Sequence, residues 1–264
     1  MSINSSSRES AQKSGTSTLI ALLSVVFFAQ LLYLNIATLL PQFVEEHFPD
    51  LNSLEVGIMF AAYQIAFILC APVVGDNLES MGRRSALFKG VGIMSLSTFV
   101  FGSAAFIKNM WGFYIISFIA RLLQGSADAF ILVTIPSILA LEFPDKFEAY
   151  QGLTNMAMGI GLAFGPVVST MLQIWFKYIA IEYFFALFIL ISGLTSVWMV
   201  PKRIDFERKK QQDEGDEIVD VPFSAYLKNR RVLMGLIAQV VAGTVICFFD
   251  PILTLRMEDI GVPP

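Results

Sequence analysis

Long apolar stretches alternate with shorter polar ones along most of this chain. A helix that crosses a lipid bilayer needs about 20 mostly apolar residues. Seven stretches meet this requirement, and together they predict an all-α integral membrane protein. They cover approximately residues 18–40, 54–74, 86–107, 111–139, 150–175, 179–200 and 232–255.

Composition agrees with this pattern and excludes several classes of function. Hydrophobic residues make up 55% of the chain and charged residues only 15%, whereas soluble domains carry about 25% charged residues. The net charge of −4 gives no support for nucleic-acid binding. His47 is the single histidine, and no nucleophile–base pair or metal-ligand cluster is present. We therefore expect neither an enzyme nor a metal site or bound cofactor.

The polar segments divide the chain into four parts. Residues 1–17 are Ser-rich and predict a disordered tail, and residues 18–200 predict a six-helix transmembrane bundle with short links. Residues 201–231 form a polar linker with a short amphipathic piece at 222–229. Residues 232–264 hold the seventh span, the start of a second half that is mostly absent. We expect a truncated gene product or a partial chain.

Basic residues are distributed unequally between the two sides of the membrane that these spans predict. Fourteen of the eighteen Lys and Arg residues fall on the side of the N-terminus, and three fall on the opposite side. Arg121 is the one left over, inside the fourth predicted span. Because cytoplasmic loops carry an excess of Lys and Arg, this distribution predicts a cytoplasmic N-terminus. The kind of membrane is left open.

Three charged residues fall deep within predicted spans, where a charge costs about 2.5–3.5 kcal/mol. Arg121 and Asp128 are seven residues apart, so they return to within about 20° on one helix face. They predict either an internal ion pair or a proton- or substrate-linked network. Asp250 precedes Pro251 in the seventh span. It is either hydrated near the membrane surface or directed at a cavity where it binds a cation.

Small and polar residues mark further positions of interest. Gly152, Gly161, Gly165 and Pro166 in the fifth span predict close helix packing. Other polar side chains within spans are either cavity-lining groups or ordinary interhelical hydrogen-bonding partners. These candidates are Gln30, Tyr33, Asn35, Tyr63, Gln64 and Asn155.

The loop after the second span resembles a signature of the major facilitator superfamily, G-x-L-x-D-R-x-G-R-R/K. Gly75, Gly82, Arg83 and Arg84 match it, and Glu79 replaces the usual Asp. Ser80 and Asn77 depart from the usual Arg and Leu. The resemblance implies a gating loop, in which the two arginines face lipid head groups or a helix C-terminus.

Two further segments are similar to signatures of the same family. Arg121, Gln124 and Gly125 fit the fourth-helix pattern R-x-x-Q-G, whose Arg is tied to proton transfer. The spacing of Gly152, Gly161, Gly165 and Pro166 is similar to the fifth-helix antiporter signature, in which Ser169 replaces the final Gly.

Within that family, the chain looks most like the drug–proton antiporter branch, near vesicular amine and polyamine carriers. Residues 41–75 and the pair Asp250-Pro251 carry this likeness. Gln30 and its neighbours stand where amine carriers have a first-helix carboxylate, which weighs against a monoamine substrate.

The resemblance implies a fold of two six-helix halves with alternating access between them. It implies antiport of a small organic cation against protons through Arg121, Asp128 and Asp250. The alternatives are a uniporter or organic-anion carrier with Arg121 as the anion site, and a non-transporting subunit or scaffold. The expected partners are lipid, a small molecule, and a protein partner or the missing half.

Overall fold

The computed structural model describes the backbone of residues 3–205 and scattered residues between 228 and 241. Long helices dominate the first of these ranges, and short 3-10 turns follow α4 and α6. In chain order the elements are α1 (Ile3–His47), α2 (Ser53–Met81), α3 (Arg83–Ala104), α4 (Met110–Glu142), η1 (Pro144–Lys146), α5 (Phe147–Gln173), α6 (Tyr178–Met199) and η2 (Lys202–Asp205).

Six of these helices are long and apolar enough to cross a membrane. They coincide with the first six predicted spans, so the prediction of an all-α membrane protein is confirmed. The seventh predicted span and the amphipathic piece at 222–229 lie outside the residues that are described continuously. Asp250 also lies outside them.

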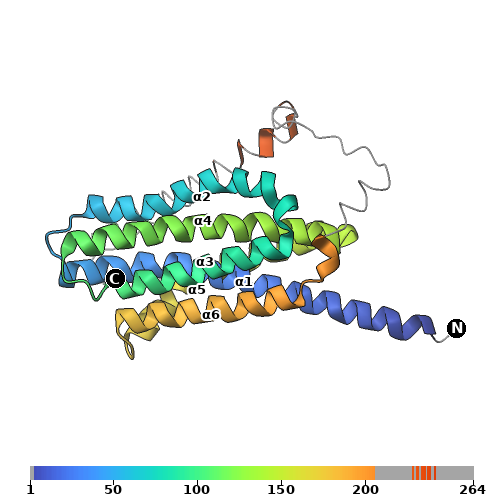
Figure 1. Cartoon of the computed structure of the whole chain (residues 1–264), viewed down its shortest axis with the longest axis horizontal. Coiled ribbons are helices and arrows are strands. Elements are labelled where there is room, and N and C mark those ends of the chain that lie inside the picture. Colours follow the sequence, from blue (N-terminus) through green and yellow to red (C-terminus); the bar gives the residue numbers. More distant parts are fainter. Residues whose placement is uncertain are drawn as a thin grey trace, which may run out of the picture. The chain divides into compact units, whose positions relative to one another are not determined.

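α1 begins earlier than the sequence indicated. Residues 3–17, predicted to be a disordered tail, continue the first span as helix. In Figure 1, the N-terminal part of α1 extends beyond the ends of the other helices. Once a span has formed its first turns, each further residue adds a backbone hydrogen bond at little cost, so the helix propagates past the apolar stretch.

Local sequence explains where several helices begin. The Asn52 side chain accepts hydrogen bonds from the backbone of Leu54 and Glu55, and the Glu55 side chain accepts one from the Asn52 backbone. This capping box starts α2 by satisfying free backbone donors. Between α2 and α3, Gly82 has φ 77°, a conformation that glycine adopts without a Cβ clash.

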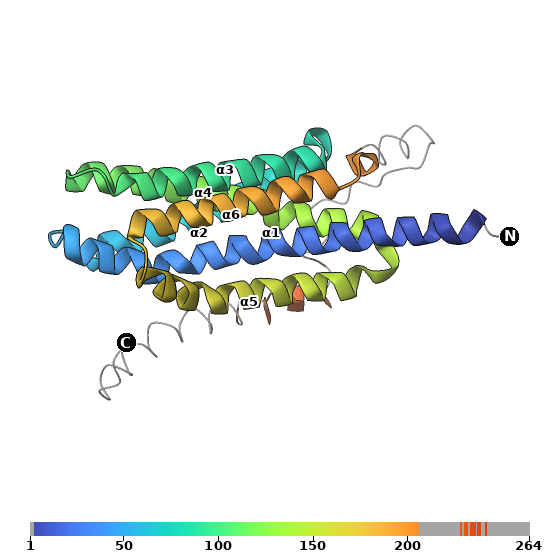
Figure 2. The same ribbon diagram turned by 90° about the horizontal axis from the view of Figure 1, so that it is seen from below.

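The helices lie along one common axis and form a bundle (Figures 1 and 2). α4 packs between α2 and α3, α3 also packs on α6, and α1 packs on both α5 and α6. Figure 2 shows α5 beside α1, on the side opposite α3. α1, α3 and α4 therefore each pack against two neighbouring helices.

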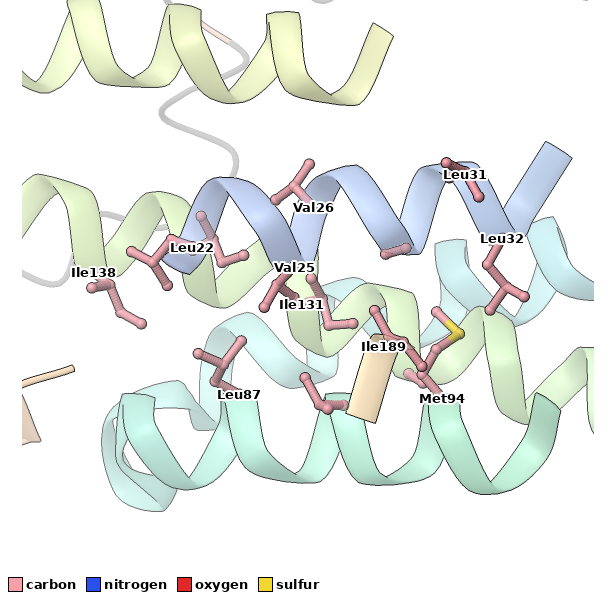
Figure 3. Close-up of a cluster of buried hydrophobic side chains, with 14 of the residues drawn as sticks. Leu22, Val25, Val26, Leu31, Leu32, Leu87, Met94, Ile131, Ile138 and Ile189 are labelled. Atoms are coloured by element: carbon pink, nitrogen blue, oxygen red, sulfur yellow. The ribbon is translucent and has the colours of Figure 1, made fainter. Parts of the chain in front are cut away.

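Two apolar clusters fill the bundle, one towards each end. The first includes Leu22, Val25, Leu87, Met94 and Ile131 and is drawn in Figure 3. The second is rich in aromatic residues from the end of the bundle where α1 meets α2. Along α3 and α4, buried polar residues occupy the positions between the two clusters. These polar residues are Thr98, Arg121 and Gln124.

Candidate functional site

Arg121 lies at the centre of the polar layer and is fully buried on α4. Its Nη1 donates to Gln124 Oε1 at 3.0 Å, and Gln124 Nε2 donates to Thr98 Oγ1 on α3 at 3.1 Å. Among the described residues, Arg121 Nε and Nη2 have no hydrogen-bond partner. The fourth-helix signature therefore builds a polar contact between α4 and α3 and leaves two guanidinium donors unused.

Aromatic rings from α1 and α2 surround the Arg121 guanidinium. Its central carbon lies 4.6 Å from the ring centroid of Tyr63, 5.5 Å from that of Phe60 and 6.0 Å from that of Tyr33. Gln64 Nε2 donates to the Tyr33 hydroxyl at 2.8 Å, which links α2 to α1. Ring faces attract a cation electrostatically by about 0.5–2 kcal/mol each, so they stabilise Arg121 in the absence of a counter-ion contact.

Asp128 is not an ion-pair partner of Arg121. Within residues 15–205, no carboxylate oxygen lies within 4.0 Å of the Arg121 guanidinium. Asp128 instead accepts from Gln30 Nε2 on α1 at 3.5 Å. The Tyr63 hydroxyl interacts electrostatically with Asp128, but it has no hydrogen-bond partner of good geometry. Seven residues correspond to about 10 Å along a helix axis, so a shared face does not bring the two charges together.

Glu182 on α6 is a buried charge that the sequence analysis missed. It is 0% exposed, and its Oε1 accepts from Asn35 Nδ2 on α1 at 3.3 Å. The Ser169 hydroxyl on α5 donates to Asn35 Oδ1 or to the Gly165 carbonyl. Glu182 lies near the start of its predicted span, where a carboxylate is ordinarily hydrated. The available signal was a pair of buried-type polar residues, Asn35 and Ser169, on other spans.

The glycines of the fifth-helix signature fall on two different faces of α5. A Cβ on Gly161 would lie 2.5 Å from the Phe27 carbonyl oxygen, and one on Gly165 would lie 2.9 Å from that of Leu31. These two glycines allow α5 to approach the α1 backbone, and Pro166 follows them within the helix. Gly125 plays the same part on α4, since an added Cβ would meet the Tyr63 carbonyl of α2.

Two predicted positions on α5 lie away from the polar layer. Gly152 is exposed and has open space around its Cα. Asn155 is also exposed, and its Oδ1 accepts from Gln151 one turn earlier on the same helix. Neither residue contacts the Arg121 site.

The loop between α2 and α3 is tied to the residues that follow α6. Arg83 Nε donates to Ser137 Oγ at 2.8 Å and Nη1 donates to the Ile204 carbonyl at 3.3 Å. Arg84 Nε donates to the Val197 carbonyl at 2.7 Å, in the last turn of α6. Asp205 Oδ1 accepts from the Arg84 backbone at 3.0 Å. Of the two environments expected for the arginines, Arg84 occupies the helix C-terminus. Gly75 and Glu79 lie on the exposed side of α2.

Buried charges and amides within membrane spans are expected at substrate or ion pathways. Residues 22–263 match the family model described as Major Facilitator Superfamily, so the chain belongs to that family. The membership shows a transporter-family protein and not an enzyme.

Similar proteins include drug and amine carriers. Multidrug resistance protein 2 of Bacillus subtilis (strain 168) is 27% identical over 195 residues, which are 73% of this chain and 46% of that protein. The rat (Rattus norvegicus) chromaffin granule amine transporter is 32% identical over 127 residues, 48% of this chain and 22% of that protein. Human (Homo sapiens) MFS-type transporter SLC18B1 is 25% identical over 215 residues, 79% of this chain and 43% of that protein. The chain spans less than half the length of these relatives.

Proposed function

We propose that this chain supplies the N-terminal half of a carrier that exchanges a small organic cation for protons by alternating access. The observation that carries the proposal is the burial of Arg121, Asp128 and Glu182 within the spans without an ion pair among them. Charges retained in a membrane interior without direct pairing are expected at ion or substrate pathways. The relatives named for multidrug resistance and amine transport support the cation as cargo.

The exposure of the helices supports a second half as partner. The apolar windows of α2 and α5 are only 22% and 17% buried, whereas those of the other four helices are 44–61% buried. Helices of a facing half would cover such surfaces in a two-half carrier. In this arrangement Asp250, which lies outside the described residues, would contribute a third carboxylate from the seventh helix.

Residues 75–84 would form the gate of this carrier. In our proposal the N-terminus and this loop are cytoplasmic, as the distribution of Lys and Arg predicts. Arg83 and Arg84 hold the loop against the residues after α6, so release of these bonds would accompany the change in access. Gly75, Glu79 and Gly82 belong to the same segment.

Uptake by reconstituted protein tests the proposal. The full chain is placed in liposomes, a pH gradient is imposed, and uptake of ethidium, a fluorescent organic cation, is followed. We expect gradient-dependent uptake that Asp128→Asn and Asp250→Asn reduce at least tenfold. The control Asp145→Asn alters an exposed residue of η1 and should leave uptake unchanged. Uptake equal to that of protein-free liposomes, or unaffected by either substitution, would overturn the proposal.

One observation favours an organic anion as the alternative cargo. Arg121 Nε and Nη2 have no hydrogen-bond partner within residues 15–205, and a guanidinium edge with two such donors suits a carboxylate or phosphate. Uptake measured with an anionic and a cationic probe in the same liposomes separates the two cargoes. If fluorescein-labelled anions are taken up and ethidium is not, the anion carrier replaces the cation carrier.

A further inference from the structure

Glu182, Asn35 and Ser169 form a second cluster of buried polar side chains. None of these residues belongs to the fourth-helix signature. The Glu182 carboxylate lies where α6 faces α1 and α3, and none of its surface is exposed. The helices are close here, since a Cβ on Gly102 of α3 would lie 2.8 Å from Glu182 Cβ. A buried ionised carboxylate is costly unless it is paired or fully hydrogen-bonded. Whether the burial of Glu182 is compensated therefore depends on what its two carboxylate oxygens contact.

The two carboxylate oxygens of Glu182 have different surroundings. Oε1 accepts from Asn35 Nδ2 at 3.3 Å, and the opposite side of that amide contacts the Ser169 hydroxyl. Oε2 is buried and has no hydrogen-bond partner in the part of the chain that the structure describes. Asn35 can donate to Oε1 whether the carboxyl group is charged or neutral. Oε2 is consequently the atom at which a proton can be gained or lost without breaking a hydrogen bond.

The charged and titratable groups that face Glu182 come from two of the helices packed around it. Arg121 on α4 acts on it electrostatically, and so does the Tyr178 hydroxyl on α6 itself. The contacts from α1, α3 and α5 are neutral: they are Asn35, Gly102 and, through Asn35, Ser169. Arg121 lies beyond 4.0 Å and is already surrounded by aromatic rings. It attracts the carboxylate electrostatically without forming an ion pair with it.

A metal cation fits this cluster poorly. Hard cations take about six or more oxygen ligands, whereas within the described residues the cluster offers one carboxylate oxygen without a hydrogen-bond partner. Within the described part of the chain, no group of three or more His, Cys, Asp or Glu residues could hold a metal ion. A proton needs no coordination shell and matches the single free oxygen.

We propose that Glu182 is a second proton-binding site of this bundle, separate from Asp128, at which Oε2 takes up and releases the proton while Asn35 holds Oε1. The carboxylate becomes a neutral carboxylic acid on protonation, and no other bond changes. Its part in transport, as a second coupling group next to Arg121, rests on the proposed function. The binding of a proton by Glu182 does not rest on that function.

Infrared difference spectroscopy of the full chain in liposomes tests this proposal. The pH is lowered from about 9 to about 5.5, a range in which exposed Asp and Glu side chains, with pKa values of about 4, stay ionised. We expect C=O bands of protonated carboxyl groups in the wild type, two of which come from Glu182 and Asp128. Glu182→Gln should remove one band and Asp128→Asn the other. The control Glu148→Gln changes an exposed residue of α5 and should leave both.

Two variants distinguish a proton site from a merely structural hydrogen bond. Glu182→Gln keeps an acceptor for Asn35, so a purely structural role predicts a variant that behaves like the wild type in the infrared titration. Asn35→Leu removes the donor to Oε1 and should move the Glu182 band to higher frequency, which checks the assignment should Glu182→Gln fail to fold.

The outcomes separate this proposal from the proposed function. A spectrum unchanged by Glu182→Gln, or a band unmoved by Asn35→Leu, would overturn the proton site. If the band titrates and disappears in Glu182→Gln while ethidium uptake is absent, the antiport function fails and the proton site stands.

Discussion

The close approach of α5 to α1 gives the sharpest test of the packing described above. In Gly161→Ala, the new Cβ would lie 2.5 Å from the Phe27 carbonyl oxygen and 3.2 Å from Gln30 Cβ. A carbon–oxygen contact is normally about 3.3–3.6 Å, and the oxygen belongs to a helix backbone that cannot rotate away. The two helices must therefore separate locally by about 1 Å.

The expected cost follows from two opposing effects. Overpacking a core typically costs about 1–3 kcal/mol, and replacing a helical glycine by alanine returns about 0.4–1 kcal/mol. The net free energy of unfolding should fall by about 1–2 kcal/mol. For a chain of this size each kcal/mol corresponds to about 2–4 °C in Tm, so we expect a decrease of about 2–8 °C.

Gly152→Ala on the same helix is the matched control. Gly152 has no atom within 4 Å of an added Cβ, so the substitution should leave Tm unchanged or raise it slightly. Both variants are heated in detergent, and size-exclusion chromatography of the heated samples measures the Tm of each. Equal shifts in the two variants would refute the assignment of the α1–α5 contact to Gly161.

Three smaller predictions concern single contacts and use the same unfolding measurement. Tyr63→Phe keeps the ring beside Arg121 and loses only the hydroxyl, which acts on Asp128 without a hydrogen bond of good geometry in the described part of the chain. It should therefore cost less than Tyr63→Leu, which removes the ring and should cost about 1 kcal/mol; equal effects would contradict the role of the ring. Asp205→Ala removes the acceptor for the Arg84 backbone at the start of α3 and should cost about 1 kcal/mol, and an unchanged Tm would show that the bond contributes nothing. Asn52→Ala breaks the capping box of α2 and should cost about 1 kcal/mol, whereas Asn52→Asp, which keeps a capping acceptor, should cost little.

The fold was largely readable from the sequence because the bilayer requires long apolar helices. The first six spans and their short connections coincide with α1–α6. The extent of α1 was not readable, since polar residues before the apolar stretch carry no signal that distinguishes a helical extension from a disordered tail. Helix propagation from an existing span decides that question.

The site was predicted in its residue types and only partly in its pairing. Arg121, Gln124, Tyr33 and Tyr63 do come together. The alternative of an Arg121–Asp128 ion pair was wrong, because a helical stripe gives direction and ignores the distance along the axis.

The placement of the glycines on two faces of α5 was predictable from the sequence. Gly152 and Gly161 are nine residues apart, which is about two and a half turns and places them on opposite faces. Gly165 is about one turn beyond Gly161 and shares its face. Glu182 is different, because nothing on its own helix marks it as buried. Its environment is made by Asn35 on α1 and by close helix packing, and such contacts exist only in the folded bundle.

The surroundings of Arg121 also bear on the order in which the bundle is assembled during synthesis. The rings that stabilise the guanidinium come from α1 and α2, which leave the ribosome before α4. When α4 enters the bilayer, a receptacle for its positive charge is therefore already present. Glu182, which acts electrostatically on the same charge, arrives only with α6. A nascent chain that lost the early rings would have to hold an unsupported cation in lipid through the synthesis of two further helices, a stage at which quality control would act on it.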